Sequence, residues 1–133
     1  RNEALRSALE QTAFPPNTHA AVFGFVDNIH DLMDAADILI SKSGGLTSAE
    51  AMAKHLPMIV VDPIPGQESR NASMIVERGA GLLALDYHNL QFKLKKVIED
   101  PLLLLDLRES AEALSQSGAA AEIIHDVYSR IAG

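Results

Sequence analysis

Ser41-Lys42-Ser43-Gly44-Gly45-Leu46-Thr47-Ser48-Ala49-Glu50 is the segment that decides the fold of this chain. It follows the apolar run Asp37-Ile38-Leu39-Ile40. It predicts a strand, a glycine turn and a helix. Glycine lets the backbone approach a ligand closely, and the unpaired N–H groups of the following helix end attract anions such as phosphate. Thr47 and Glu50 also have the spacing of a capping box, which needs no ligand. Both interpretations stay open at this point.

The rest of the chain alternates between short β-rich runs and amphipathic helices. We expect strands at 19–24, 37–40, 56–62 and 81–85. Three apolar stripes with helical spacing then occupy the last third, ending with Ile123, Ile124, Val127 and Ile131. Strands joined through helices predict an α/β fold, a Rossmann-like doubly wound parallel sheet with helices on both faces and a helical carboxyl-terminal third. Because Arg1 leads directly into a helical pattern, we expect that the first strand is missing.

Composition limits the classes of protein to which the chain can belong. Its 133 residues are 47% hydrophobic and 22% charged, as in a single soluble domain with a core. A net charge of −7 disfavours nucleic acid as a partner. The apolar runs are too short to span a bilayer, so we expect a cytoplasmic protein with peripheral membrane contact only. The chain has no cysteine, and its five histidines lack metal-ligand spacing, so neither a metal nor another cofactor is expected.

Three turns follow expected strands and carry unusual residues, at 24–28, 43–50 and 63–71. Ligands of open α/β sheets bind beyond the carboxyl ends of the strands, so we expect all three turns to line one rim. The first would offer backbone and apolar groups to a base, and the second N–H donors to a diphosphate. The third would offer amide and carboxylate groups to sugar hydroxyls. Lys42 and Arg70 could each neutralise a phosphate or remain surface charges.

Three motifs carry a family resemblance: Ser43-Gly44-Gly45-Leu46-Thr47-Ser48-Ala49-Glu50-Ala51, Leu56-Pro57, and Pro63-Ile64-Pro65-Gly66-Gln67-Glu68-x-x-Asn71. They resemble the carboxyl-terminal, donor-binding domain of GT-B glycosyltransferases. More narrowly, the chain is similar to the family 28-like branch of monogalactosyldiacylglycerol synthases and processive diacylglycerol glucosyltransferases. The resemblance covers nearly all of residues 1–133. It implies a UDP-sugar-binding domain, truncated at its start, without the acceptor-binding domain.

The resemblance also implies roles for individual residues. The backbone at Phe25 and Val26 would contact uracil, and Glu50 would hold the ribose hydroxyls. Gln67 and Glu68 would reach the donor sugar, although both also suit a helix N-terminus on dipole grounds alone. The full set of implied substrate-binding residues is Phe25, Val26, Ser43, Gly44, Gly45, Leu46, Thr47, Glu50, Gly66, Gln67, Glu68 and Asn71.

The implied activity is transfer of a hexose from a UDP-sugar to a lipid hydroxyl, that of diacylglycerol. No catalytic residue is assigned, because the general base would lie in the acceptor-binding half, so this fragment is expected to bind the donor without turnover. Two alternatives remain from the sequence. One is an enzyme similar to UDP-N-acetylglucosamine 2-epimerases, and the other is a non-catalytic nucleotide-sugar-binding subunit.

Overall fold

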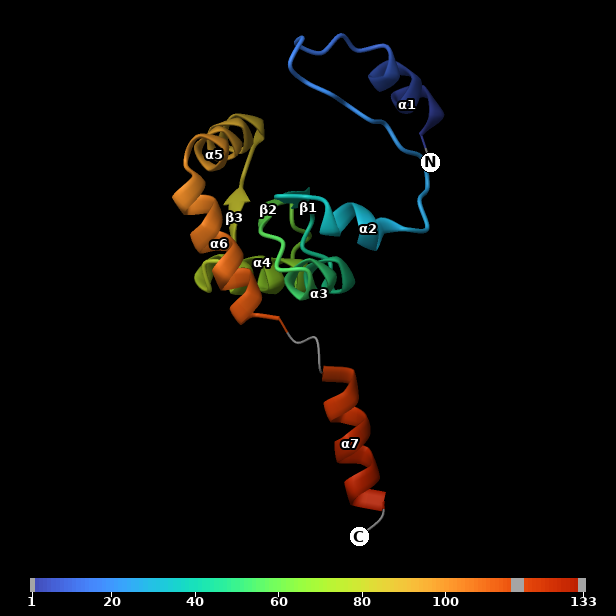
Figure 1. The fold of residues 1–133 in the computed structure, drawn as a ribbon, viewed down its shortest axis with the longest axis vertical. Helices are drawn as coiled ribbons and strands as arrows, with labels where there is room; N and C mark the ends of the chain where they lie inside the picture. The colour runs from blue at the N-terminus through green and yellow to red at the C-terminus, as the bar shows by residue number, and fades with distance from the viewer. Residues whose placement is uncertain (1, 116–118, 132–133) are drawn as a thin grey trace.

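A three-stranded parallel sheet forms the centre of the protein, seen here in a computed structural model that describes residues 2–115 and 119–131 (Figure 1). Its strands are β1 (Leu39–Ser41), β2 (Met58–Val61) and β3 (Gly81–Ala84), in the order β1-β2-β3. Met58 of β2 lies opposite Leu39 of β1 and Gly81 of β3. These strands confirm the expected runs at 37–40, 56–62 and 81–85, with shifted or shorter bounds.

Helices precede, connect and follow the strands. They are α1 (Glu3–Glu10), α2 (Ile29–Asp34), α3 (Gly45–Ala53), α4 (Gln67–Glu77), α5 (Tyr87–Glu99), α6 (Pro101–Ala113) and α7 (Ala119–Ile131). In that order α3 joins β1 to β2, and α4 joins β2 to β3. The predicted Rossmann-like α/β architecture is therefore confirmed, since successive parallel strands are joined through helices.

The core lies on both faces of the central strand. Met58 and Val60 are fully buried and belong to one cluster with side chains of α3 and α4. Because side chains alternate along a strand, Ile59 points to the opposite face, and it is also fully buried. Helix α5 contacts both β2 and β3. Burial on both sides explains why β2 is a continuous apolar run instead of an alternating one.

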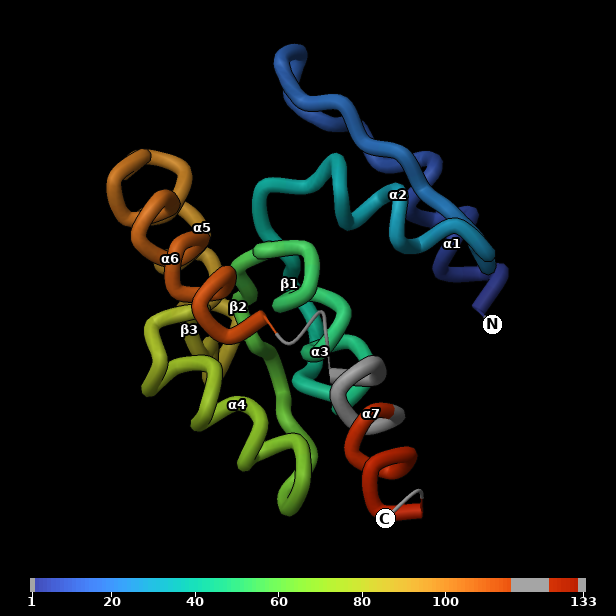
Figure 2. The backbone as a smooth tube through the Cα atoms, turned by 60° about the horizontal axis from the view of Figure 1, so that its bottom comes forward, coloured from blue at the N-terminus to red at the C-terminus, as the bar shows by residue number. Residues whose placement is uncertain are grey.

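The amino-terminal segment contains the expected helix, as α1, but not the expected strand. Residues 19–24 form no strand, and α1 contains no buried residue, with Leu5 and Leu9 on its exposed surface. Figures 1 and 2 both draw this part of the chain apart from the sheet. A strand forms by pairing with a neighbour, and the sheet of the described residues contains only β1, β2 and β3. The expectation of a strand at 19–24 is therefore wrong for this structure.

The carboxyl-terminal third is helical, as predicted. The side chain of Asp86 accepts a hydrogen bond from the N–H of Asn89 at 2.7 Å and caps α5, while Asp100 caps α6 in front of Pro101. Helix α7 includes the expected third stripe, but the side chains of Ile123 and Ile124 lie outside the described part. None of the helices in the ranges described has both the length and the hydropathy that a bilayer crossing requires.

Candidate functional site

The amino-terminal end of α3 lies at the carboxyl edge of the sheet and has no side-chain cap. Gly44 occupies the N-cap position, and no side-chain hydrogen bond caps this end. Thr47 is already the third residue of the helix, so the capping-box explanation of Thr47 and Glu50 is wrong. The backbone N–H groups of Gly45, Leu46 and Thr47, called the amide cluster below, have no acceptor within the helix, and the helix dipole makes them electropositive.

The two glycines of this turn are not explained by the fold. Gly44 has φ −58° and ψ 145°, which other residues adopt readily, and a Cβ added there would meet no atom within 4 Å. A Cβ on Gly45 would lie 3.5 Å from Nε2 of Gln67, an ordinary contact. At Gly81, by contrast, a Cβ would come within 2.3 Å of the carbonyl oxygen of Met58. Packing therefore explains why residue 81 is a glycine. It does not explain the glycines at positions 44 and 45.

Two hydrogen bonds connect this turn to the amino-terminal half of α4. The Oγ of Ser43, which is fully buried, donates to the carbonyl oxygen of Glu68 at 2.7 Å. Nδ2 of Asn71 donates to the carbonyl oxygen of Ser43 at 2.9 Å. The side chain of Gln67 also lies against Gly45. The structure therefore brings together the residues predicted in the second and third turns.

The third turn has a backbone shape that favours glycine. Gly66 has φ 111° and ψ −119°, and α4 begins directly after it at Gln67. Oε2 of Glu68 accepts a hydrogen bond from the backbone N–H of Ile64 at 2.7 Å. The carboxylate of Glu68 thus stabilises its own turn. This bond gives Glu68 a structural role that does not require a ligand. The side chain of Gln67 remains exposed next to the amide cluster.

The charged residues predicted near the site lie at its outer edge. Glu50 is exposed one helical turn after Leu46, on the side of α3 that faces solvent. Nζ of Lys42 pairs with Oδ2 of Asp62 at 3.1 Å, which joins the residues that follow β1 and β2. Arg70 is exposed on α4. All three charged residues are therefore accessible to solvent, and Lys42 is already paired with a carboxylate.

The first turn does not join the other two. Phe25 borders a separate pocket, which it shares with Phe23, Gly24, the α1 N-cap residue Asn2 and the α1 residues Glu3 and Arg6. Val26 follows in the same segment, which both ribbon and tube views place away from the sheet (Figures 1 and 2). The expected common rim therefore contains the turns at 43–50 and 63–71 but not the turn at 24–28.

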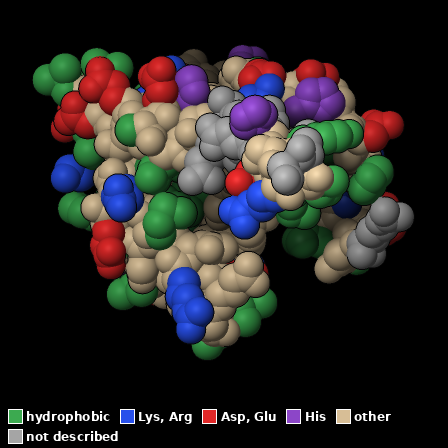
Figure 3. Space-filling model, turned by 90° about the horizontal axis from the view of Figure 1, so that it is seen from below, with side chains coloured by type: hydrophobic (Ala, Val, Ile, Leu, Met, Phe, Trp, Pro, Cys, Tyr) green, Lys and Arg blue, Asp and Glu red, His purple; other side chains and the backbone are tan. Residues whose placement is uncertain are grey.

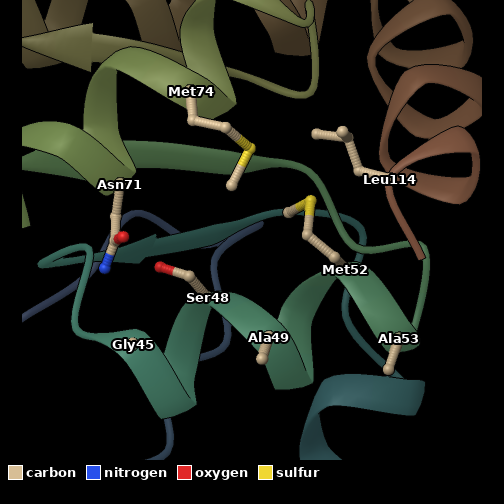
Figure 4. A pocket seen from close by; sticks show the side chains of 8 residues that line it. All are labelled: Gly45, Ser48, Ala49, Met52, Ala53, Asn71, Met74 and Leu114. Carbon is tan, nitrogen blue, oxygen red and sulfur yellow. The ribbon is translucent and has the colours of Figure 1, made fainter. Parts of the chain in front are cut away.

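A second pocket, of about 320 Å³, lies between α3 and α4 and was not predicted (Figure 4). Gly45 and Asn71 border it near the amide cluster, and Met52, Met74 and Leu114 supply apolar walls. Ser48 also lines it. This side chain is only 5% exposed, and its Oγ has no hydrogen-bond partner in the described structure. The sequence contained one sign that Ser48 is buried. Ala51 and Met52 follow it by three and four residues, a spacing that puts all three on the same face of the helix.

The charge distribution on the side seen in Figure 3 does not indicate a particular kind of ligand. Lys and Arg side chains are scattered there among acidic and hydrophobic ones, without a continuous basic surface. Among the side chains that the structure describes, no group of three or more His, Asp or Glu is arranged to hold a metal ion.

The parallel sheet, its connecting helices and the uncapped α3 end define an open α/β domain of the Rossmann type. The chain matches the glycosyltransferase family 28 C-terminal domain over residues 2–127. It therefore belongs to this family, which confirms the resemblance drawn from residues 43–51 and 63–71.

The chain is also similar to proteins named processive diacylglycerol beta-glucosyltransferase. It is 31% identical over 127 residues to that of Bacillus mycoides strain KBAB4, covering 96% of this chain and 33% of the relative. It is 32% identical over 124 residues to that of Bacillus cereus strain G9842, covering 93% of this chain and 32% of the relative. The chain thus spans about one third of the length of these curated relatives.

Proposed function

We propose that the amide cluster binds the diphosphate of a UDP-sugar. The observation that carries this proposal is an uncapped helix end preceded by two glycines that packing does not require. The bonds of Ser43 and Asn71 hold the start of α4 next to it, so sugar-binding groups would stand beside the phosphates. Such an arrangement stabilises a negatively charged leaving group without a metal ion.

The remaining contacts follow the family resemblance. Glu50 would accept hydrogen bonds from both ribose hydroxyls, and Gln67, Glu68 and Asn71 would contact the sugar. Solvent exposure of Glu50 and Gln67 supports these roles. The uracil contact of Phe25 and Val26 is supported by the resemblance alone, because the structure places this segment beside α1.

For the whole protein we propose transfer of a hexose from the UDP-sugar to a lipid hydroxyl, that of diacylglycerol. Family membership and the names of the two relatives support a lipid acceptor. The general base and the peripheral membrane contact would belong to the part of the relatives that this chain does not span. The same family match favours a transferase over an epimerase or a non-catalytic subunit.

The first test is calorimetric titration of the folded 133-residue chain with UDP, where we expect weak binding and no transferase activity. Absence of any heat at millimolar UDP would count against the proposal.

In Gly45→Ala the new methyl group has room and lies in an exposed first turn, so we expect stability to rise by about 0.4–1 kcal/mol. The affinity for UDP should nevertheless fall, because the methyl group obstructs approach to the backbone. Unchanged affinity would contradict this role of the glycine.

The second test separates ribose from phosphate recognition. Glu50→Gln should weaken UDP binding about tenfold, the scale of one charge-assisted hydrogen bond, and should not weaken pyrophosphate binding, because pyrophosphate has no ribose and loses only a nearby negative charge. Glu77→Gln is the matched control, since Glu77 is an exposed glutamate near the other end of α4. Equal losses in the two variants would exclude a specific ribose contact at Glu50.

A further inference from the structure

We propose that a pocket on the outer side of α4, called the arginine pocket below, binds a phosphodiester group. Its volume is about 400 Å³, and the residues that line it are Ser69, Arg70, Ser73, Met74, Glu77 and Arg78. None of them belongs to the residues proposed to contact the UDP-sugar. The inference therefore does not depend on the donor site.

The spacing of these residues along α4 brings the two arginines to one place. Residues four positions apart are neighbours on a helix surface, so the pocket is formed by two adjacent rows opposite the buried residues of the helix. One row is Arg70, Met74 and Arg78, and the other is Ser69, Ser73 and Glu77. The ends of the first row are about 12 Å apart along the helix axis, so two long arginine side chains can meet above Met74.

Both guanidinium groups are available to a ligand. Arg70 and Arg78 are exposed, and within the described part of the structure neither side chain has an ion pair or a hydrogen bond. Most other described Lys and Arg side chains pair with a carboxylate, namely Arg6, Lys42, Lys54, Lys95, Arg108 and Arg130. A guanidinium group binds two oxygens of a phosphate at once. The arginine pocket thus offers two unused sets of phosphate donors.

The charge of the pocket favours a phosphodiester over a phosphomonoester. Two guanidinium groups and the carboxylate of Glu77 give a net charge of +1. A phosphodiester carries a single negative charge, whereas a phosphomonoester carries about −1.5 to −2 at pH 7. The additional charge of a monoester would be repelled by Glu77, which pairs with neither arginine.

The other lining groups fit the rest of such a ligand. Ser73 has an exposed hydroxyl that can donate to a phosphate oxygen. Met74 is 41% exposed and supplies an apolar contact for the carbon atoms next to an ester oxygen. The oxygens of a phosphodiester are arranged tetrahedrally, so guanidinium groups can approach from both ends of the row. Both oxygens of a carboxylate lie at one end of that group, which makes it a poorer match.

The experiment uses the complete chain with ¹⁵N-labelled arginine and glycerophosphoglycerol, a soluble phosphodiester, as the probe. We expect saturable shifts of the Nε–H signals of Arg70 and Arg78 in NMR spectra. Arg6 and Arg108 pair with carboxylates outside the pocket and serve as internal controls. Acetate at the same ionic strength should leave all four signals almost unchanged.

Three variants make the test specific. Arg78→Gln should weaken binding of the probe about tenfold, the scale of a hydrogen bond between charged groups. Lys96→Gln is the matched control, because it removes an exposed positive charge from α5, outside the pocket. Glu77→Gln should strengthen binding of glycerol 3-phosphate, a phosphomonoester, more than binding of the diester. Circular dichroism of each variant verifies that it is folded.

Phosphodiesters occur both in phospholipid headgroups and in soluble esters, and sedimentation with phosphatidylglycerol vesicles separates these sources. Vesicle binding that Arg78→Gln abolishes would assign the pocket to a lipid headgroup. Binding of glycerophosphoglycerol without vesicle binding would assign it to a soluble ester.

Three results would overturn the proposal: no shift of the Arg70 and Arg78 signals, equal shifts of all four arginines, or equal losses in Arg78→Gln and Lys96→Gln. The titration contains no UDP, so its failure leaves the donor site untouched. Conversely, failure of the UDP titration would leave an observed phosphodiester site in place.

Discussion

Replacing Ser43 by alanine tests the connection between the two turns of the candidate site. The hydroxyl is fully buried, and it donates to the carbonyl oxygen of Glu68 across 25 positions of sequence. Alanine fits the same space but cannot make this bond. The carbonyl of Glu68 lies in the first turn of α4, so its intrahelical bond remains available.

The expected loss follows from that geometry. A buried neutral hydrogen bond contributes about 0.5–1.5 kcal/mol net, and the upper end applies to Ser43 because no water can replace its hydroxyl. We therefore expect a free energy of unfolding that is lower by about 1–1.5 kcal/mol. For a chain of this length such a change lowers the midpoint of thermal unfolding by several degrees.

Urea unfolding followed by circular dichroism measures this change, with Ser69→Ala as the matched control. The Oγ of Ser69 also donates to a backbone carbonyl, that of Ile64, but at 3.3 Å and in contact with solvent. Its loss should cost less than about 0.5 kcal/mol. If the two variants lost equal stability, or if Ser43→Ala unfolded like the parent, the buried bond would not be what joins the turns.

Three further predictions concern packing, charge and capping. Gly81→Ala should lower the free energy of unfolding by about 3 kcal/mol or more, because its Cβ would collide with the carbonyl of Met58; urea unfolding at near-parent stability would contradict this. Asp62→Asn should change stability by less than about 1 kcal/mol, since its pair with Lys42 is exposed, but calorimetry should show tighter UDP binding because a negative charge leaves the rim. Asp100→Ala should cost about 1 kcal/mol in thermal unfolding through loss of the α6 cap, and an unchanged midpoint would refute that cap.

The fold was predictable where strand and helix patterns are long or bounded by strong signals. The apolar runs at 56–62 and 81–85 predicted β2 and β3 within a few residues of their observed positions. The run at 19–24 has similar composition but forms no strand, because strand formation depends on a pairing partner that composition does not reveal.

The site was predictable to a similar extent. The glycine turn and the Gln67 turn meet as expected, since both follow neighbouring parallel strands. Sequence alone could not decide whether Thr47 caps α3, because the motif fits two helix starts that differ by a few residues. It also could not identify Ser48 as an unpaired hydroxyl, which depends on how α3 and α4 pack.

The two halves of the proposed donor site differ in how much order they already have. Ser43 and Asn71 fix the glycine turn to α4, so phosphate and sugar contacts would form without ordering new backbone. Phe25 borders a pocket with residues of α1, so residues 24–28 would have to move towards the turn, which lowers affinity by the cost of ordering that segment. The gain in free energy of binding from the uracil would therefore be small in this chain. A structural element that held Phe25 and Val26 against the edge of β1 would increase that gain without changing any phosphate contact.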